Sequence, residues 1–215
     1  MNLLQLIQHV DYTGIQKTLA QNPALANEAI ALDERDTVKA HPLHRLCDGV
    51  FHRMYTDEQA VEMAKIFLAY GASVDGYERV ENRDTPLVAA ASLHADAVAQ
   101  LYLEHGADIH HGGCHGGTAL HWAAWCGRDK LVERLLQEPV EINRRCVDFH
   151  STPLLWAVHG YKFGEGSNRH HQVACVKLLL QAGADATIPN KDGHSPYDFL
   201  QPEDHELRML LASIN

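Results

Sequence analysis

The stretch Thr118-Ala119-Leu120-His121-Trp122-Ala123-Ala124 decides the fold of this chain. A threonine before a run of helix-forming residues is a typical N-cap, because its hydroxyl accepts a hydrogen bond from a backbone N–H in the first turn. The small alanines that follow allow close packing against a neighbouring helix. The stretch therefore predicts a short, closely packed helix that starts directly after Thr118.

Similar beginnings recur along the chain, each with a threonine, serine or histidine before a proline or alanine. They are His41-Pro42-Leu43-His44, Thr85-Pro86-Leu87, Thr118-Ala119-Leu120-His121, Thr152-Pro153-Leu154 and Ser195-Pro196-Tyr197. Proline is favoured at the first helical position, where its missing N–H is not needed. Each of these segments predicts the start of a helix.

A second set of segments predicts where helices end. These segments are residues 71–75, 106–110, 139–143 and 183–187, and three of the four begin with glycine. Each follows an apolar run, for example Leu178-Leu179-Leu180. Glycine just past a helix end permits the left-handed conformation that commonly terminates a helix. Each unit therefore contains a second helix that carries the apolar run and ends in a turn.

The spacing of these segments shows a repeat. From the proline position to the next glycine position the distances are 29, 20, 20 and 30 residues, and from there to the next proline position 15, 13, 14 and 13. The basic period is 33 or 34 residues, with insertions of nine and ten residues in the second and fifth units. One such helix pair cannot bury its own apolar face, so the units must stack. We expect one repeat domain over residues 1–215, with degenerate capping units at both ends and unit boundaries near 1–35, 36–75, 76–110, 111–143, 144–187 and 188–215.

These residues resemble the ankyrin repeat family. Residues 118–124 are close to the signature of that family, and Gly106-Ala107-Asp108 and Gly183-Ala184-Asp185 match its repeat ending. The resemblance implies an all-α solenoid with finger turns between units, which binds a protein or peptide partner through its concave face and fingers. Three departures from the family pattern weaken individual caps: His41 in place of threonine, Ala119 in place of proline and Pro139 in place of glycine.

The first helices of such a stack line its concave face. The third and sixth positions after the proline position point outward from this face. In successive units these positions hold Arg45 and Asp48, Ala89 and Ser92, Trp122 and Trp125, and Trp156 and His159. All three tryptophans of the chain thus fall on predicted concave positions. We interpret them as anchors of a binding surface, since tryptophan and arginine are enriched at interface hot spots and exposed apolar patches mark interaction sites. The alternative is that the indoles pack against neighbouring helices.

The two insertions lie between the first and second helices of their units, at residues 49–55 and 160–167. Both begin with glycine seven residues after the proline position, and both mix aromatic with basic side chains. We expect inserted loops, which are often functional in compact folds. The alternative is that their aromatic side chains only cover the helix ends. The candidate contact residues in them are Phe51, Arg53, Tyr55, Tyr161, Lys162 and Phe163.

The finger before the fourth unit reads His110-His111-Gly112-Gly113-Cys114-His115. These are ligand types that zinc prefers, although no Cys-x-x-Cys pair accompanies them. A metal-responsive or small-molecule-responsive regulator that uses this finger is therefore the alternative function. The chain contains no P-loop, no Gly-x-Gly-x-x-Gly and no nucleophile-elbow pattern. We expect a binding protein that is not an enzyme and holds no cofactor.

Composition narrows the choice of partner and compartment. The formal net charge is −10, and an acidic surface repels the phosphates of nucleic acids. No long uncharged apolar run predicts a membrane span, and residues 1–10 lack the basic lead of a secretory signal. The five irregularly spaced cysteines are typical of reduced thiols. We expect a cytoplasmic monomer; a homodimer joined through the tryptophans is the alternative.

Overall fold

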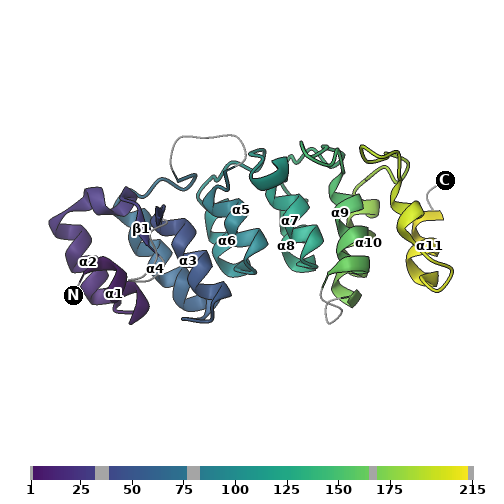
Figure 1. Cartoon of the computed structure of the whole chain (residues 1–215). Helices are drawn as coiled ribbons and strands as arrows, with labels where there is room; N and C mark the ends of the chain where they lie inside the picture. Colours follow the sequence, from purple (N-terminus) through teal and green to yellow (C-terminus); the bar gives the residue numbers. More distant parts are fainter. Residues whose placement is uncertain (1, 32–38, 77–82, 165–168, 213–215) are drawn as a thin grey trace. The chain divides into compact units, whose positions relative to one another are not determined.

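The computed structural model describes residues 2–31, 39–76, 83–164 and 169–212 of the chain (Figure 1). Within these ranges the protein is helical apart from one short two-stranded ribbon. Its backbone contacts divide it into two compact units, unit 1 (Met1–Asp108) and unit 2 (Ile109–Asn215), and each is described by itself. The prediction of an all-α fold built from helix pairs is confirmed.

Unit 1 contains three successive helix pairs. Its helices are α1 (Leu3–Gln8), α2 (Tyr12–Gln21), the 3-10 helix η1 (Pro23–Asn27), α3 (Pro42–Phe51), α4 (Asp57–Ala69), α5 (Pro86–Ser92) and α6 (Asp96–Glu104). Strands β1 (Ile30–Ala31) and β2 (Lys39–Ala40) pair antiparallel, with Ile30 opposite Ala40. The first helices α3 and α5 pack side by side, and the second helices α2, α4 and α6 form the neighbouring layer. Leu43, Phe67 and Tyr102 are fully buried between the layers.

Unit 2 repeats this arrangement. Its helices are the 3-10 helix η2 (Cys114–Gly116), α7 (Ala119–Trp125), α8 (Asp129–Leu135), α9 (Pro153–Phe163), α10 (Arg169–Gln181), the 3-10 helix η4 (Pro196–Phe199) and α11 (His205–Ala212). First helix α7 packs on first helix α9, and second helix α8 packs on second helix α10. Helix η4 continues the first layer against α9, and α11 continues the second layer against α10. Leu135, Leu154 and Leu179 are fully buried in its core.

The helix boundaries follow the sequence signals. The hydroxyls of Thr85 and Thr152 accept from the backbone N–H of the third residue that follows, at 3.4 and 3.3 Å, and a proline occupies the first helical position after each. Gly106 and Gly183 lie just past α6 and α10 with φ of +78° and +94°. This left-handed conformation is the one that glycine adopts without steric cost. The predicted caps and stops are confirmed at these positions.

His41 caps α3 where a threonine is expected. Its Nδ1 accepts from the Leu43 N–H at 3.2 Å, so the ring proton lies on Nε2, which donates to Oδ1 of Asn27 at 3.0 Å. The side chain is buried. Burial, followed by the nearby His44, lowers the pKa of His41 from 6.5 to about 4. The imidazole therefore replaces a hydroxyl as N-cap only in its neutral form.

His121 makes the corresponding contacts in unit 2. The Thr118 N–H donates to its Nδ1 at 3.1 Å, and its Nε2 donates to the carbonyl oxygens of Arg144 and Ser151, both at 3.2 Å. It is fully buried, and burial lowers its pKa from 6.5 to about 4. His121 thus ties the start of α7 to both sides of the next finger.

These two histidines make the fold sensitive to acid. Their pKa values are depressed in the folded state, so their contribution is complete above pH 6.5 and is lost as the pH falls from 6.5 toward 4. Each contributes at most roughly 3 kcal/mol over that interval. We expect the melting temperature, followed by circular dichroism, to fall between pH 6.5 and 5, and to fall less in the double variant His41→Gln/His121→Gln. An equal fall in the wild type and the double variant would contradict this account.

The insertions do not form loops where they begin. Helix α3 continues to Phe51 and α9 continues to Phe163, so the first inserted residues lengthen the first helices. The expectation of inserted loops is wrong for these residues; residues 165–168 of the second insertion lie outside the described ranges. The glycine that begins each insertion lies inside a helix, at a point where another part of the chain comes close. A Cβ on Gly49 would overlap the ring of Tyr55, and a Cβ on Gly160 would overlap the carbonyl oxygen of Trp125.

Replacement of Gly160 tests this close approach. Alanine has the higher helix propensity by about 1 kcal/mol, so propensity alone predicts that Gly160→Ala stabilises α9. The overlap with the Trp125 carbonyl predicts the opposite sign, a loss of about 1–3 kcal/mol. We expect urea unfolding to show the loss. Lys177→Ala, on the exposed side of α10, serves as the control and should change the free energy of unfolding by less than about 0.5 kcal/mol.

Candidate functional site

Aromatic side chains gather on one side of unit 2. They come from α7, from the turn before α9, from α9 itself and from η4. We call this set the aromatic cluster. Its members are Trp122, Trp125, Phe149, Trp156, His159, Phe163 and Phe199. It brings together the four residues that the sequence placed on the concave face of the fourth and fifth repeats, Trp122, Trp125, Trp156 and His159.

Trp156 is the centre of the aromatic cluster. Its ring centroid lies 5.1 Å from that of Trp122 at an interplanar angle of 82°, and 6.3 Å from that of Trp125 at 75°. Phe149 approaches it to 6.4 Å. These edge-to-face arrangements are favourable for aromatic rings. Trp156 is only 6% exposed, so it supports the surface from below, while Trp122 and Trp125 keep part of their area accessible.

His159 extends the aromatic cluster along α9. Its ring stacks on Trp125 with centroids 5.0 Å apart and planes 28° apart, and it lies 4.4 Å from Phe163 and 5.5 Å from Phe199. Among the described residues its ring nitrogens have no hydrogen-bond partner. Burial lowers the pKa of His159 below 6.5. At neutral pH it therefore presents one N–H donor and one acceptor nitrogen without a net charge.

The burial of His159 gives a measurable titration. We expect the His159 Cε1–H resonance, assigned by its disappearance in His159→Gln, to titrate with a midpoint below 6.5. Trp125→Leu removes the stacked indole and should move that midpoint upward, toward the ordinary value. A wild-type midpoint at or above 6.5 would show that the ring is not desolvated.

A pocket with a volume of about 550 Å³ opens between these rings. It is lined by His115, Trp122, Trp125, Phe149, Ser151, Leu155, Trp156, His159, Asn190, Asp192, His194 and Phe199. Gly117 makes room for two of its walls, because a Cβ there would lie 2.9 Å from the Trp156 ring and 3.3 Å from Nε1 of Trp122. That Nε1–H is buried and has no hydrogen-bond partner, which costs about 1–3 kcal/mol. Exposed Phe149 and Phe163 add apolar surface to the cluster.

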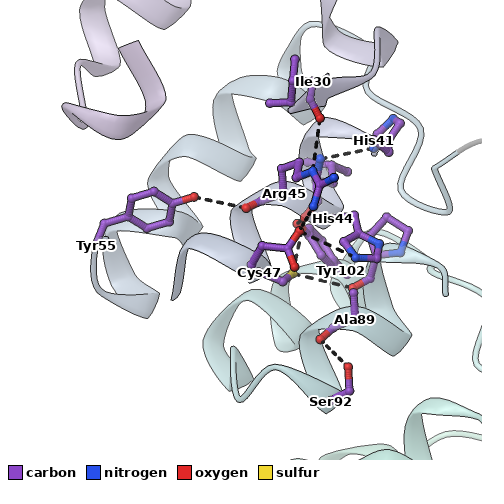
Figure 2. Close-up of polar contacts among 12 residues, drawn as sticks. Ile30, His41, His44, Arg45, Cys47, Tyr55, Ala89, Ser92 and Tyr102 are labelled. Carbon is purple, nitrogen blue, oxygen red and sulfur yellow. Dashed lines mark hydrogen bonds and ion pairs between the residues drawn. The ribbon is translucent and has the colours of Figure 1, made fainter. Parts of the chain in front are cut away.

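The predicted concave residues of unit 1 are engaged with each other. Arg45 is buried, its Nη1 lies 2.7 Å from Oδ2 of Asp48, and its Nε donates to the Ile30 carbonyl oxygen at 3.2 Å (Figure 2). Asp48 also lies 3.9 Å from Nε2 of His44. The equivalent positions of the next repeat hold buried Ala89 and half-buried Ser92. In unit 1 these positions connect the repeat to β1 and form no aromatic surface.

The candidate residues of the first insertion have three different environments. Phe51 is 51% exposed, with edge contacts to His52 and His94 at 5.4 and 6.1 Å. Arg53 is exposed and has a left-handed backbone, with φ of +57°. Tyr55 is buried, and its hydroxyl donates to the Arg45 carbonyl oxygen at 3.4 Å (Figure 2). Phe51 and Arg53 are accessible, whereas Tyr55 covers the end of α3.

The second insertion divides in the same way. Nζ of Lys162 lies 2.6 Å from Oδ2 of Asp204, and both side chains are largely buried. Tyr161 hydrogen-bonds to the same carboxylate. Desolvation raises the pKa of Tyr161 most, and the Asp204 carboxylate raises it further. These two residues hold the last repeat against α9 through Asp204. Phe163, at 62% exposed, belongs to the aromatic cluster and is the accessible one of the three.

The histidines of the finger at residues 110–115 do not point toward a shared metal site. Nδ1 of His115 lies 2.8 Å from Oδ2 of Asp148, and Nδ1 of His110 lies 3.6 Å from Oε1 of Glu141. No group of three or more histidine, cysteine or acidic side chains suited to a metal ion occurs in the part of the chain that the structure describes. His115 instead lines the pocket, 5.0 Å from Phe149.

Sequence reasoning missed several residues of this site. Phe149, Asn190, Asp192 and His194 line the pocket from fingers, outside the regular first-helix positions. Phe199 lines it from η4, at the third position after Pro196, which is equivalent to Trp122 and Trp156. A signal existed for Phe149, because an apolar residue in a polar turn three residues before a threonine cap has no place in the helix core. Phe199 followed from the same third-position rule, which the sequence analysis did not extend to the last repeat. Asn190, Asp192 and His194 carry no pattern that a single sequence reveals.

No helix in the described ranges is long and apolar enough to cross a bilayer. None of the five cysteines forms a disulfide, and Cys47, Cys146 and Cys175 are buried. The Sγ of Cys47 donates to the carbonyl oxygens of Leu43 and Pro86 at 3.4 and 3.8 Å. The buried thiols are part of the helix packing.

Comparison with protein families matches the ankyrin repeat model of three copies to residues 51–146 and the single ankyrin repeat model to residues 149–191. Together these matches cover more than half of the chain. Among solved structures, an ankyrin repeat domain from Acinetobacter baumannii AYE has 24% sequence identity and a TM-score of 0.72, and covers 99% of this chain and 96% of its own. The ankyrin repeat protein EF0377 has 25% sequence identity and a TM-score of 0.72, and the match covers 99% of this chain and 97% of that protein.

The curated relatives are similar over part of the chain only. The rat ankyrin repeat and SAM domain-containing protein 6 is 32% identical over 102 residues, which is 46% of this chain and 10% of that protein. The Arabidopsis thaliana E3 ubiquitin-protein ligase KEG is 35% identical over 53% of this chain and 7% of its own length. The mouse palmitoyltransferase ZDHHC13 is 33% identical over 43% of this chain and 13% of its own length. The chain thus spans about a tenth of the length of these relatives, and the enzymatic regions of the homologues lie outside the aligned part.

Proposed function

Because the chain belongs to the ankyrin repeat family, whose repeats generally bind proteins, we propose that it is a non-enzymatic module that binds a protein partner through the aromatic cluster of unit 2. The observation that carries this proposal is the pocket of about 550 Å³ with its aromatic walls. Pockets of roughly 300–1,000 Å³ are typical of ligand sites. Large rigid aromatic side chains bury much area at low entropy cost, which makes them frequent hot spots.

The uncompensated groups at the pocket support the same proposal. A fold that only needed to pack its core would not leave the Trp122 N–H without a partner, nor keep Phe163 exposed. Such local costs concentrate at functional sites. Accessible Phe51 and Arg53 of unit 1 are a second, separate set of candidate contacts within this proposal. Arg45, Tyr55, Tyr161 and Lys162 have structural partners and act in it by shaping the helices.

The cysteines, none of which forms a disulfide, support a cytosolic protein, and the acidic composition supports one that does not bind nucleic acid. For the metal alternative the described residues offer no converging ligands, so no second function is proposed. The partner is a different protein, and the chain itself is a monomer.

Affinity capture with matched variants tests the proposal. The double variant Trp125→Ala/Phe163→Ala removes accessible rings and spares the buried Trp156. We expect a protein captured by the wild type to be lost with the double variant, and its purified form to bind that variant about 30-fold or more weakly. Met209→Ala is the control, because it removes a 75% exposed apolar side chain of α11 outside the cluster.

Both variants must first show the wild-type circular dichroism spectrum. Capture of the same proteins by all three forms would refute the role of the aromatic cluster. Sedimentation of the wild type as a dimer that the double variant abolishes would replace the foreign partner by a second copy of this chain.

A further inference from the structure

We propose that the pocket of the aromatic cluster takes an arginine side chain from an extended segment of the partner protein, with the guanidinium stacked on the indole and phenyl faces and paired with the Asp192 carboxylate. This inference rests on the proposed function, because it names the chemistry of the group that enters the same pocket.

The walls of the pocket favour a planar cation. Trp122, Trp125, Phe149, Trp156 and Phe199 line it, and the face of each ring carries a negative quadrupole. A cation within about 6 Å of a ring centroid is attracted to that face, most strongly for tryptophan. A guanidinium is weakly hydrated and planar, so it stacks on such rings at a lower desolvation cost than an ammonium.

The charged residues that line the pocket also favour a cation. No lysine or arginine lines it, and its one acidic residue is Asp192. The backbone N–H of Asp192 donates to Asn190, but its carboxylate has no hydrogen-bond or ion-pair partner among the described residues. An arginine fork matches a carboxylate in a bidentate geometry that a lysine cannot make. The pocket thus offers both the stacking surface and the counter-ion for a guanidinium.

Unit 2 already places cations from its own chain on its rings. The guanidinium carbon of Arg208 lies 4.4 Å from the Tyr197 ring centroid, and that of Arg169 lies 5.4 Å from the Tyr161 centroid. The ammonium of Lys191, which does not line the pocket, lies 5.4 Å from the centroid of Phe149, which does. The backbone N–H of Lys191 also donates to the Phe149 carbonyl oxygen at 3.0 Å, so this ring of the pocket already has one cation of the chain beside it.

An apolar anchor fits the pocket less well. A leucine or phenylalanine side chain would fill the space between the rings but would leave the Asp192 carboxylate, which is exposed, without a counter-ion. The arginine side chain supplies apolar methylenes for the rings and a charged end for the carboxylate.

Intrinsic tryptophan fluorescence reads the pocket directly, because all three tryptophans of the chain line it. We would titrate the full chain with four short peptides that differ only in their central residue, which is arginine, citrulline, lysine or leucine. We expect the arginine peptide to bind about ten-fold or more tightly than the neutral, isosteric citrulline peptide, and more tightly than the lysine and leucine peptides.

Two charge-matched variants locate the effect. Asp192→Asn should weaken binding of the arginine peptide about five-fold or more and leave the citrulline peptide unchanged. Glu133→Gln, on the exposed side of α8 and outside the pocket, makes the same charge change and should alter neither.

Several outcomes would overturn the inference: equal affinity for arginine and citrulline, equal affinity for arginine and lysine, no response to any peptide, or no effect of Asp192→Asn. If the leucine peptide binds best, the arginine inference fails while the peptide-binding pocket stands. If the capture experiment also shows no dependence on Trp125 and Phe163, both proposals fail.

Discussion

The close approach of α9 to α7 is the constraint on which the site in unit 2 depends. Gly160 has no side chain, so α9 comes so near the end of α7 that a Cβ there would overlap the Trp125 carbonyl oxygen. Gly117 leaves the corresponding space beneath the rings of Trp122 and Trp156. With the two first helices this close, Trp156 packs edge-to-face with two indoles that belong to the preceding repeat. Larger residues at the two glycines would separate the helices and open the aromatic cluster.

The second constraint is the neutral imidazole of His121. Its Nε2–H binds carbonyl oxygens on both sides of the following finger, at Arg144 and Ser151, and its Nδ1 accepts from Thr118. These bonds fix the finger relative to α7, and the finger carries Phe149 over the pocket. The ring of His121 also lies 5.3 Å from that of Trp156. A residue that the repeat uses as a helix cap therefore also positions the wall of the candidate binding pocket.

The sequence predicted those parts of the structure that a local rule determines. Caps such as Thr152 and stops such as Gly183 depend on a few neighbouring residues, so the period and the helix pairs followed from them. The first residues of the insertions were expected to form loops, but they continue helices, and glycine is needed there because another backbone or ring comes close, as at Gly49 and Gly160. That contact is made by residues from other elements, and no local pattern reports it. The burial of Trp156 was hidden for the same reason. Arg45 and Asp48, by contrast, lie three residues apart on α3, a spacing at which side chains pair locally, and the interpretation as a binding surface passed over that pairing.

The two units use the same positions of the repeat in opposite ways. In unit 1 the positions hold Arg45 and Asp48, which satisfy each other at 2.7 Å and leave no unpaired group at that site. In unit 2 they hold aromatic residues, and Asp192, the one acidic residue that lines the pocket, has no partner for its carboxylate in the described chain. The backbone scaffold is the same, so the difference lies in the side chains that the repeat leaves free to vary. The ion pair of unit 1 is complete within its own helix, whereas in the complex proposed above the rings and the carboxylate of unit 2 would receive their counterpart from the partner.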